Sequence, residues 1–167
     1  MLKKLIPWIA WAVSVWISDQ YAGGYWVVGS VFGIAVLIAN LKRILPNFSP
    51  KYFVFLMVST LVYALVYGLS SKGWRFQSDW VDMLAGATTA GVIVGSLLLP
   101  AVHAYLFGTD VKTVRRVSIK LIVSWYLMIL ISWIDDSLNV PLSIDYLLIA
   151  IALWQGIYIK NMKIKSP

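Results

Sequence analysis

The residues of this chain that could do binding chemistry stand near the ends of its apolar segments. Trp74, Arg75, Asp79, Trp80 and Asp82 lie within nine residues of one another. Aromatic rings attract cations, and carboxylates form charge-assisted hydrogen bonds with cationic groups. This pattern predicts a binding site for a small cationic or heterocyclic solute. Three acids in other segments are expected to join the same site: Asp19, Asp135 and Asp136.

The same residues also allow a purely structural interpretation. Tryptophans gather at the two edges of a membrane as an aromatic belt. A carboxylate at the start of a helix, such as Asp82, can cap the unpaired backbone amides there. Both interpretations stay open at the level of the sequence.

A second candidate lies near the end of the fourth apolar segment, where His103 follows Pro100 by three residues. Proline removes one backbone hydrogen bond and kinks a helix. Histidine changes its charge close to neutral pH. Together they predict a proton-linked gate, and the alternative is a histidine beside Tyr105 that hydrogen-bonds at the level of the lipid headgroups.

Catalytic chemistry has little support in the sequence. The chain has one His, no Cys and no Glu, which speaks against a zinc or haem site. No motif of an intramembrane protease, phosphatase or alcohol transferase is present, although proteolysis by two aspartates stays open. We therefore expect a non-enzymatic protein with no metal, no cofactor and no catalytic residue.

The elements that must position these residues are apolar helices. Of the 167 residues, 60% are hydrophobic and 13% charged, against about 45–50% and about 25% in soluble domains. This excludes a soluble enzyme, a disordered tail and a nucleic-acid-binding domain. Six segments approach the roughly 20 residues of a spanning helix: Leu5–Ser18, Tyr25–Leu41, Tyr52–Ser70, Val81–Phe107, Val117–Ile134 and Tyr146–Ile159.

The charges orient these segments. Twelve Lys and Arg residues face one side of the six-span arrangement, and only Lys72 and Arg75 face the other. Basic loops stay in the cytoplasm. We predict an all-α polytopic protein of the cytoplasmic (inner) membrane. Its six transmembrane helices would form three hairpins in a single domain over residues 1–167, with both termini cytoplasmic. Pro7 prefers the first turn of a helix, so the sequence leaves open whether the first segment crosses the membrane completely.

Small residues at four-residue spacing let membrane helices approach closely. They occur in the second, fourth and sixth segments, as Gly29 and Gly33, Gly91 and Gly95, and Gly156 after Ala152. The spacing predicts that these three helices pack against one another at the centre of the bundle.

Residues 111–120 combine a repeat of valines with four basic residues. Valines at i, i+3 and i+6 with basic neighbours favour a helical extension that lies on the anionic inner leaflet. A plain basic flank after a membrane segment is the alternative.

One local resemblance covers about a fifth of the chain. Residues Val62–Gly95 contain Arg75, then Asp82-Met83-Leu84-Ala85-Gly86, and they resemble the second half of VanZ-like membrane proteins. That family has an Asn where Gly86 stands and a Gly where Thr89 stands. The resemblance implies a role in the cell envelope. The six-span layout is also similar to that of the substrate-binding subunits of energy-coupling-factor vitamin transporters.

The leading functional prediction is a protein that binds or passes a small solute from the outer side of the membrane. One alternative is a self-associating effector, immunity or accessory protein that acts through another membrane protein or as a homo-oligomer. The other alternative is a protein that handles envelope lipids or lipid-linked glycans.

Overall fold

The computed structural model describes residues 25–46, 48–74, 87–137 and 146–164, together with separate positions between Leu5 and Trp16. Within these residues the chain is all-helical and contains no strand, which confirms the expected α class. The helices outside the N-terminal segment are α2 (Tyr25–Ala39), α3 (Leu41–Ile44), α4 (Lys51–Trp74), α6 (Ala87–Phe107), α7 (Val111–Ser137) and α8 (Tyr146–Asn161).

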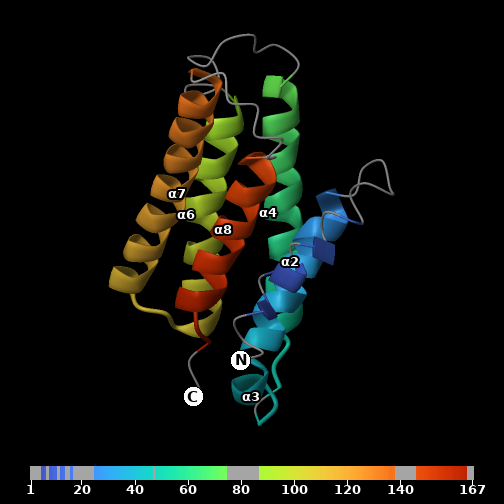
Figure 1. The fold of residues 1–167 in the computed structure, drawn as a ribbon. Coiled ribbons are helices and arrows are strands. Elements are labelled where there is room, and N and C mark those ends of the chain that lie inside the picture. The colour runs from blue at the N-terminus through green and yellow to red at the C-terminus, as the bar shows by residue number, and fades with distance from the viewer. Residues whose placement is uncertain are drawn as a thin grey trace.

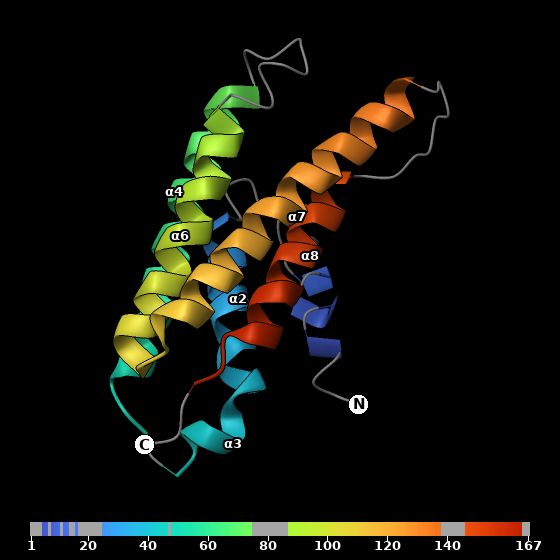
Figure 2. The same ribbon diagram turned by 90° about the vertical axis from the view of Figure 1, so that its left-hand side faces the viewer.

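The long helices form an elongated bundle in which each packs against its neighbours (Figure 1). Helix α4 lies between α2 and α6, α7 packs against α6 and α8, and α8 touches α2. Helix α3 and the turn between α6 and α7 lie at one end of the bundle, as both views show (Figure 2). The first residues of α6 and α8 lie towards the opposite end.

A short turn reverses the chain between α6 and α7. Gly108 has a φ of +66°, a left-handed conformation that favours glycine after a helix, and its amide donates to the carbonyl of Ala104 at 2.8 Å. Asp110 then caps α7, because its carboxylate accepts hydrogen bonds of 2.8 Å from the amide and the hydroxyl of Thr113. These two caps set α6 and α7 side by side.

The Asp110 cap also explains why α7 begins at Val111, six residues before the predicted segment. The stretch 111–120 is therefore a helical extension, as one of the two interpretations expected. Its basic side chains are all exposed: Lys112, Arg115, Arg116 and Lys120. Its position on an anionic leaflet stays a prediction.

Glycines bring α2 and α6 onto α4. A Cβ added at Gly29 would lie 2.7 Å from the Cα of Thr60, and one at Gly95 would lie 2.8 Å from a methyl of Val66. Gly33 likewise faces Ser59 and Leu56 of α4.

Of the contacts expected between the three glycine-bearing helices, those of Gly29, Gly33 and Gly95 are made with α4 rather than with one another. Helices α2 and α6 share α4 as their main neighbour. Helix α8 contacts both of them through side chains, with Tyr158 beside Phe32 of α2 and hydrogen-bonded to the Leu99 carbonyl of α6. Small residues create a flat face on a helix but do not choose which helix occupies it. Gly91 is buried on α6, and Gly156 is half-buried on α8.

The end of α2 is tied to the segment after α8. The Asn40 amide donates to the Val36 carbonyl at 2.9 Å and accepts a 3.1 Å bond from the backbone of Ile164. Arg43 donates to the Ile164 carbonyl at 2.8 Å. Met162 and Ile164 are both buried, so residues 162–164 belong to the packed end of the bundle.

Asn40→Leu is expected to lower the free energy of unfolding by about 1–3 kcal/mol, because it leaves a buried backbone donor and a buried acceptor unpaired. Asn161→Leu is the matched control, since Asn161 makes one local bond, to the carbonyl of Ile157 at 2.7 Å. Thermal unfolding in detergent measures both variants. Equal losses would show that the tie to Ile164 contributes nothing.

One helix of the described chain, over Thr89–Phe107, is long and apolar enough to cross a membrane by length and composition. The apolar stretches Val27–Ala39 and Lys51–Val66 are shorter. The six-span topology thus stays a prediction.

Candidate functional site

The side chains of the predicted outer cluster lie outside the part of the chain that the structure describes. Of its members, Asp19, Arg75, Asp79, Trp80 and Asp82 lie outside the described residues. Three more stand within helical bounds with side chains that are likewise outside the description: Trp74, Asp135 and Asp136. The site built on them stays a prediction.

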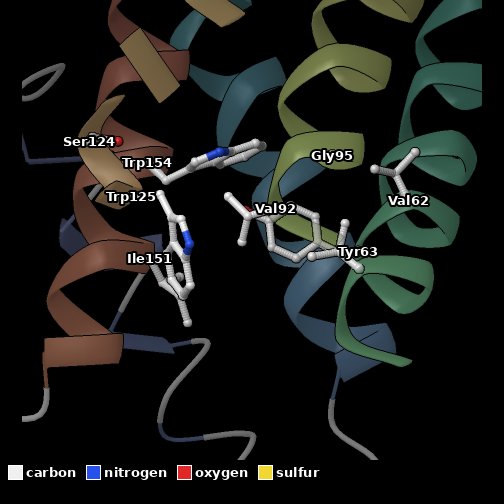
Figure 3. Close-up of a pocket in the computed structure, with 9 residues that line it drawn as sticks. Val62, Tyr63, Val92, Gly95, Ser124, Trp125, Ile151 and Trp154 are labelled. Atoms are coloured by element: carbon white, nitrogen blue, oxygen red, sulfur yellow. The ribbon is translucent and has the colours of Figure 1, made fainter. Parts of the chain in front are cut away.

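The described residues instead form a partly open pocket of about 80 Å³ between α4, α6, α7 and α8. Its α6 residues stand in the half of that helix nearer Ala87, whereas its residues from α4, α7 and α8 stand around the middle of those helices. The pocket therefore lies near the middle of the bundle, and Figure 3 shows its lining side chains. Its lining consists of Val62, Tyr63, Val66, Val92, Gly95, Ser124, Trp125, Ile151 and Trp154.

Two indole rings dominate one wall of the pocket, opposite Tyr63 and Val62 (Figure 3). The indole N–H of Trp125 donates to the Thr89 hydroxyl at 3.2 Å, and that of Trp154 donates to the Ser96 hydroxyl at 2.9 Å. Thr89 and Ser96 are seven residues apart, so they lie on one face of α6, two turns from each other. This face holds both rings in place while the indoles line the pocket.

Further aromatic contacts fix the position of Trp154. Its ring stacks on Tyr158 with centroids 5.9 Å apart and meets Tyr63 edge-on at 5.8 Å. Phe32 lies 5.1 Å from both tyrosine rings. Such contacts each add about 0.5–1.5 kcal/mol beyond burial, so they favour the observed position of the Trp154 ring.

Polar atoms without partners lie beside this apolar lining. Among the described residues, the Tyr63 hydroxyl and both amide atoms of Gln155 are buried and make no hydrogen bond. Gln155 lies close enough to the Tyr63 hydroxyl to interact with it, but the pair does not reach hydrogen-bond geometry. An unpaired buried polar group costs about 1–3 kcal/mol, so these groups call for an explanation.

The predicted gate residues, Pro100 and His103, stand in the half of α6 nearer Phe107. Pro100 stands inside α6, and the Tyr158 hydroxyl donates to the neighbouring Leu99 carbonyl at 3.3 Å. His103 is fully buried, with its Nδ1 atom 3.2 Å from the Thr109 hydroxyl and its Nε2 atom unpartnered among the described residues.

The surroundings of His103 are aromatic. Its ring lies 4.8 Å from that of Phe107 and 5.6 Å from that of Phe55. Tyr105, the neighbour expected at the headgroup level, is 89% exposed, whereas His103 faces the core. The gating role of Pro100 and His103 stays a prediction.

The sequence interpretation missed the residues that build the pocket. Gln155, next to the lining residue Trp154 but not itself part of the lining, was an available signal, because polar side chains inside an apolar segment mark candidate functional sites. Within the described part of the chain, no group of three His, Cys, Asp or Glu side chains could hold a metal ion.

Comparisons with known proteins give no family for this chain. No family model matches it, and neither a curated protein nor a solved structure shows significant similarity. The local resemblance of Val62–Gly95 to VanZ-like proteins is therefore not supported by a match at the level of the family.

Proposed function

We propose that this protein is a non-enzymatic integral membrane protein that binds a small aromatic or heterocyclic solute from the outer side. The observation that carries the proposal is the pocket between α4, α6, α7 and α8 with its two fixed indole rings.

The distribution of polarity over the bundle supports the membrane setting. On α4, Phe53, Met57 and Leu61 are each more than half exposed, whereas Ser59 is fully buried. A continuous apolar stripe in water marks an interaction surface or an aggregation hazard, but in lipid it is the expected exterior. A second stripe follows α7, over Ile119, Val123, Leu127, Leu130 and Ile134.

The distribution of charge supports an orientation in which one end of the bundle faces the cytoplasm. Exposed basic residues gather at the end of the bundle that holds α3, the start of α7 and the end of α8: Lys42, Arg43, Lys51, Lys112, Arg115, Arg116, Lys120, Lys160 and Lys163. Basic segments next to a membrane prefer the cytoplasmic side and its anionic lipids. With that end inside, the pocket lies near the middle of the bundle, and its α6 residues Val92 and Gly95 stand in the outer half of their helix.

The pocket lining favours a flat, uncharged solute. Two indoles and a phenol offer ring faces, and aromatic rings pack favourably against one another. No described lining residue carries a charge. An anion would therefore lose its hydration without gaining a partner, and a cation would gain only ring faces in return.

A pair of variants on one helix tests the proposal with 4-fluorotoluene as the probe, followed by ¹⁹F NMR. Val92→Phe is expected to weaken binding by at least about tenfold, since each 1.4 kcal/mol is a factor of ten and the new ring would occupy the pocket. Val94→Phe is the control, because Val94 is exposed two residues further along α6.

Partition of the probe into detergent is the same for all three proteins, so a difference between them reports the pocket. The proposal fails if the wild type and Val92→Phe bind the probe equally. Native mass spectrometry of the purified wild type is the companion measurement, because it identifies a solute that co-purifies with the protein.

A further inference from the structure

We infer that the exposed face of α7 binds an anionic phospholipid of the inner leaflet. The phosphate of this lipid would lie at Lys112, Arg115 and Arg116, and an acyl chain would lie along the apolar residues that follow. The inference goes beyond the proposed function. It shares with that function the membrane setting and the orientation of the bundle, and it involves no residue of the pocket.

Three cations share one face near the start of α7. Arg115 and Arg116 follow Lys112 by three and four residues, and such spacings make side chains neighbours on a helix. All three are exposed. Among the side chains described at this end of the bundle, the only acid is Asp110, and its carboxylate is held in the cap by Thr113. The cations therefore outnumber the acids on this face.

The same face continues as an apolar stripe. Ile119 stands seven residues after Lys112, and Val123 stands seven after Arg116, so each is about two turns further along. Ile119, Val123 and Leu130 are each about half exposed. A phospholipid joins its phosphate to its acyl chains in the same order, so the face matches the lipid from the headgroup to the chain.

The length of α7 places the cations at the level of the headgroups. Its 27 residues span about 40 Å at about 1.5 Å per residue, whereas the hydrocarbon core is about 30 Å thick. The exposed apolar stripe from Ile119 to Ile134 covers about 23 Å of that length. In the proposed membrane setting, residues 111–116 therefore extend past the hydrocarbon core on the basic side, where lipid phosphates lie.

The chemistry of the cations selects an anionic headgroup. A guanidinium can donate two parallel hydrogen bonds to a phosphate, and Lys112 adds a third positive charge beside the two arginines. A zwitterionic lipid carries its own ammonium next to the phosphate, and the three cations repel that ammonium. Clusters of basic residues directly after a membrane helix accordingly favour anionic lipids.

Native mass spectrometry of the detergent-solubilised protein tests the inference with two lipids that differ only in their headgroups. These are phosphatidylglycerol and phosphatidylcholine, each with one palmitoyl and one oleoyl chain. We expect the wild type to bind phosphatidylglycerol at least about tenfold more tightly than phosphatidylcholine. Arg115→Gln/Arg116→Gln is expected to reduce this preference to less than about threefold.

A second double variant controls for net charge. Lys42→Gln/Lys163→Gln removes the same two charges from exposed positions at the same end of the bundle. Lys163 lies in the segment after α8 that Arg43 ties to α3, and α3 stands apart from the start of α7 in both views (Figure 1, Figure 2). We expect this variant to keep the wild-type preference for phosphatidylglycerol.

Two further measurements complete the test. Glycerol 3-phosphate carries the headgroup phosphate without acyl chains, and we expect it not to displace the lipid at the same concentration. Because Arg115 and Arg116 are exposed, their double variant is expected to keep the Tm of the lipid-free protein. Lys112→Gln/Arg116→Gln removes two charges from the same face and carries the test if the first variant does not fold.

Several results would overturn the inference. The wild type could bind both lipids equally, the preference could survive in Arg115→Gln/Arg116→Gln, or both double variants could lose it to the same extent, which would make net charge the cause. Displacement by glycerol 3-phosphate would show a site for free phosphate instead. Binding of 4-fluorotoluene is expected to be the same in Arg115→Gln/Arg116→Gln and the wild type, so a failure of the pocket and a failure of the lipid site are read separately.

Discussion

Gly29→Leu is expected to prevent the accumulation of folded protein. Even a single Cβ at this position would lie 2.7 Å from the Cα of Thr60 and 2.8 Å from the Cβ of Tyr63. The first of these is backbone, which cannot rotate out of the way as a side chain can. A leucine would therefore push α2 off α4 and break the 3.0 Å bond between Ser30 and Thr60.

The expected loss in the free energy of unfolding is at the upper end of the range for overpacked cores, about 3 kcal/mol or more. That is a large part of the 5–15 kcal/mol by which a typical protein is stable. Size-exclusion chromatography and thermal unfolding of the detergent-purified protein measure the effect.

Gly95→Ala is the graded control. Its added methyl would meet only a methyl of Val66, at 2.8 Å, and a valine side chain can adjust where a backbone cannot. We expect Gly95→Ala to lower the free energy of unfolding by about 1 kcal/mol and Gly29→Ala to lower it by more. Wild-type melting of Gly29→Leu would show that α2 does not lie against α4.

Cysteine labelling of the two ends of the bundle is expected to give an all-or-none difference. The chain has no Cys, so each introduced thiol is read without background. In intact cells, Asp136→Cys is expected to react with a membrane-impermeant maleimide. Lys163→Cys is expected to react only after the cells are permeabilised, because the basic end faces the cytoplasm.

Burial of the introduced thiol would not explain a lack of labelling at position 163, since Lys163 is exposed in the structure. Labelling of permeabilised cells provides the control, because the reagent then reaches both cysteines. Strong labelling of Lys163→Cys in intact cells would reverse the orientation, and the α6 residues of the pocket would then stand in the cytoplasmic half of their helix. Equal labelling of both sites in intact cells would contradict the six-span topology.

Local patterns in the sequence were enough to locate the helices. The predicted segment Tyr146–Ile159 appears as α8 (Tyr146–Asn161), and Tyr25–Leu41 appears as α2 (Tyr25–Ala39). The prediction for α7 began too late, at Val117, because the valine repeat and the Asp110 cap lie among basic residues rather than in the apolar run. Helix ends depend on caps, which an apolar segment does not reveal.

The pairing of helices could not be read in the same way. Gly29 and Gly95 mark faces that allow close approach, but both faces meet α4 rather than each other. A small-residue motif predicts that another helix approaches closely. Which helix does so depends on the packing of the whole bundle.

The sequence by itself determined the helical class and the gathering of basic residues in a few segments, because both follow from residue type and local spacing. Only the tertiary structure decided which side chains form the pocket. Tyr63, Trp125 and Trp154 come from three helices, and a hydroxyl face of α6 orients both indoles. Whether a buried amide such as Gln155 has a partner is likewise a property of neighbours in space. Neighbours brought together from distant parts of the chain leave no periodic pattern in it.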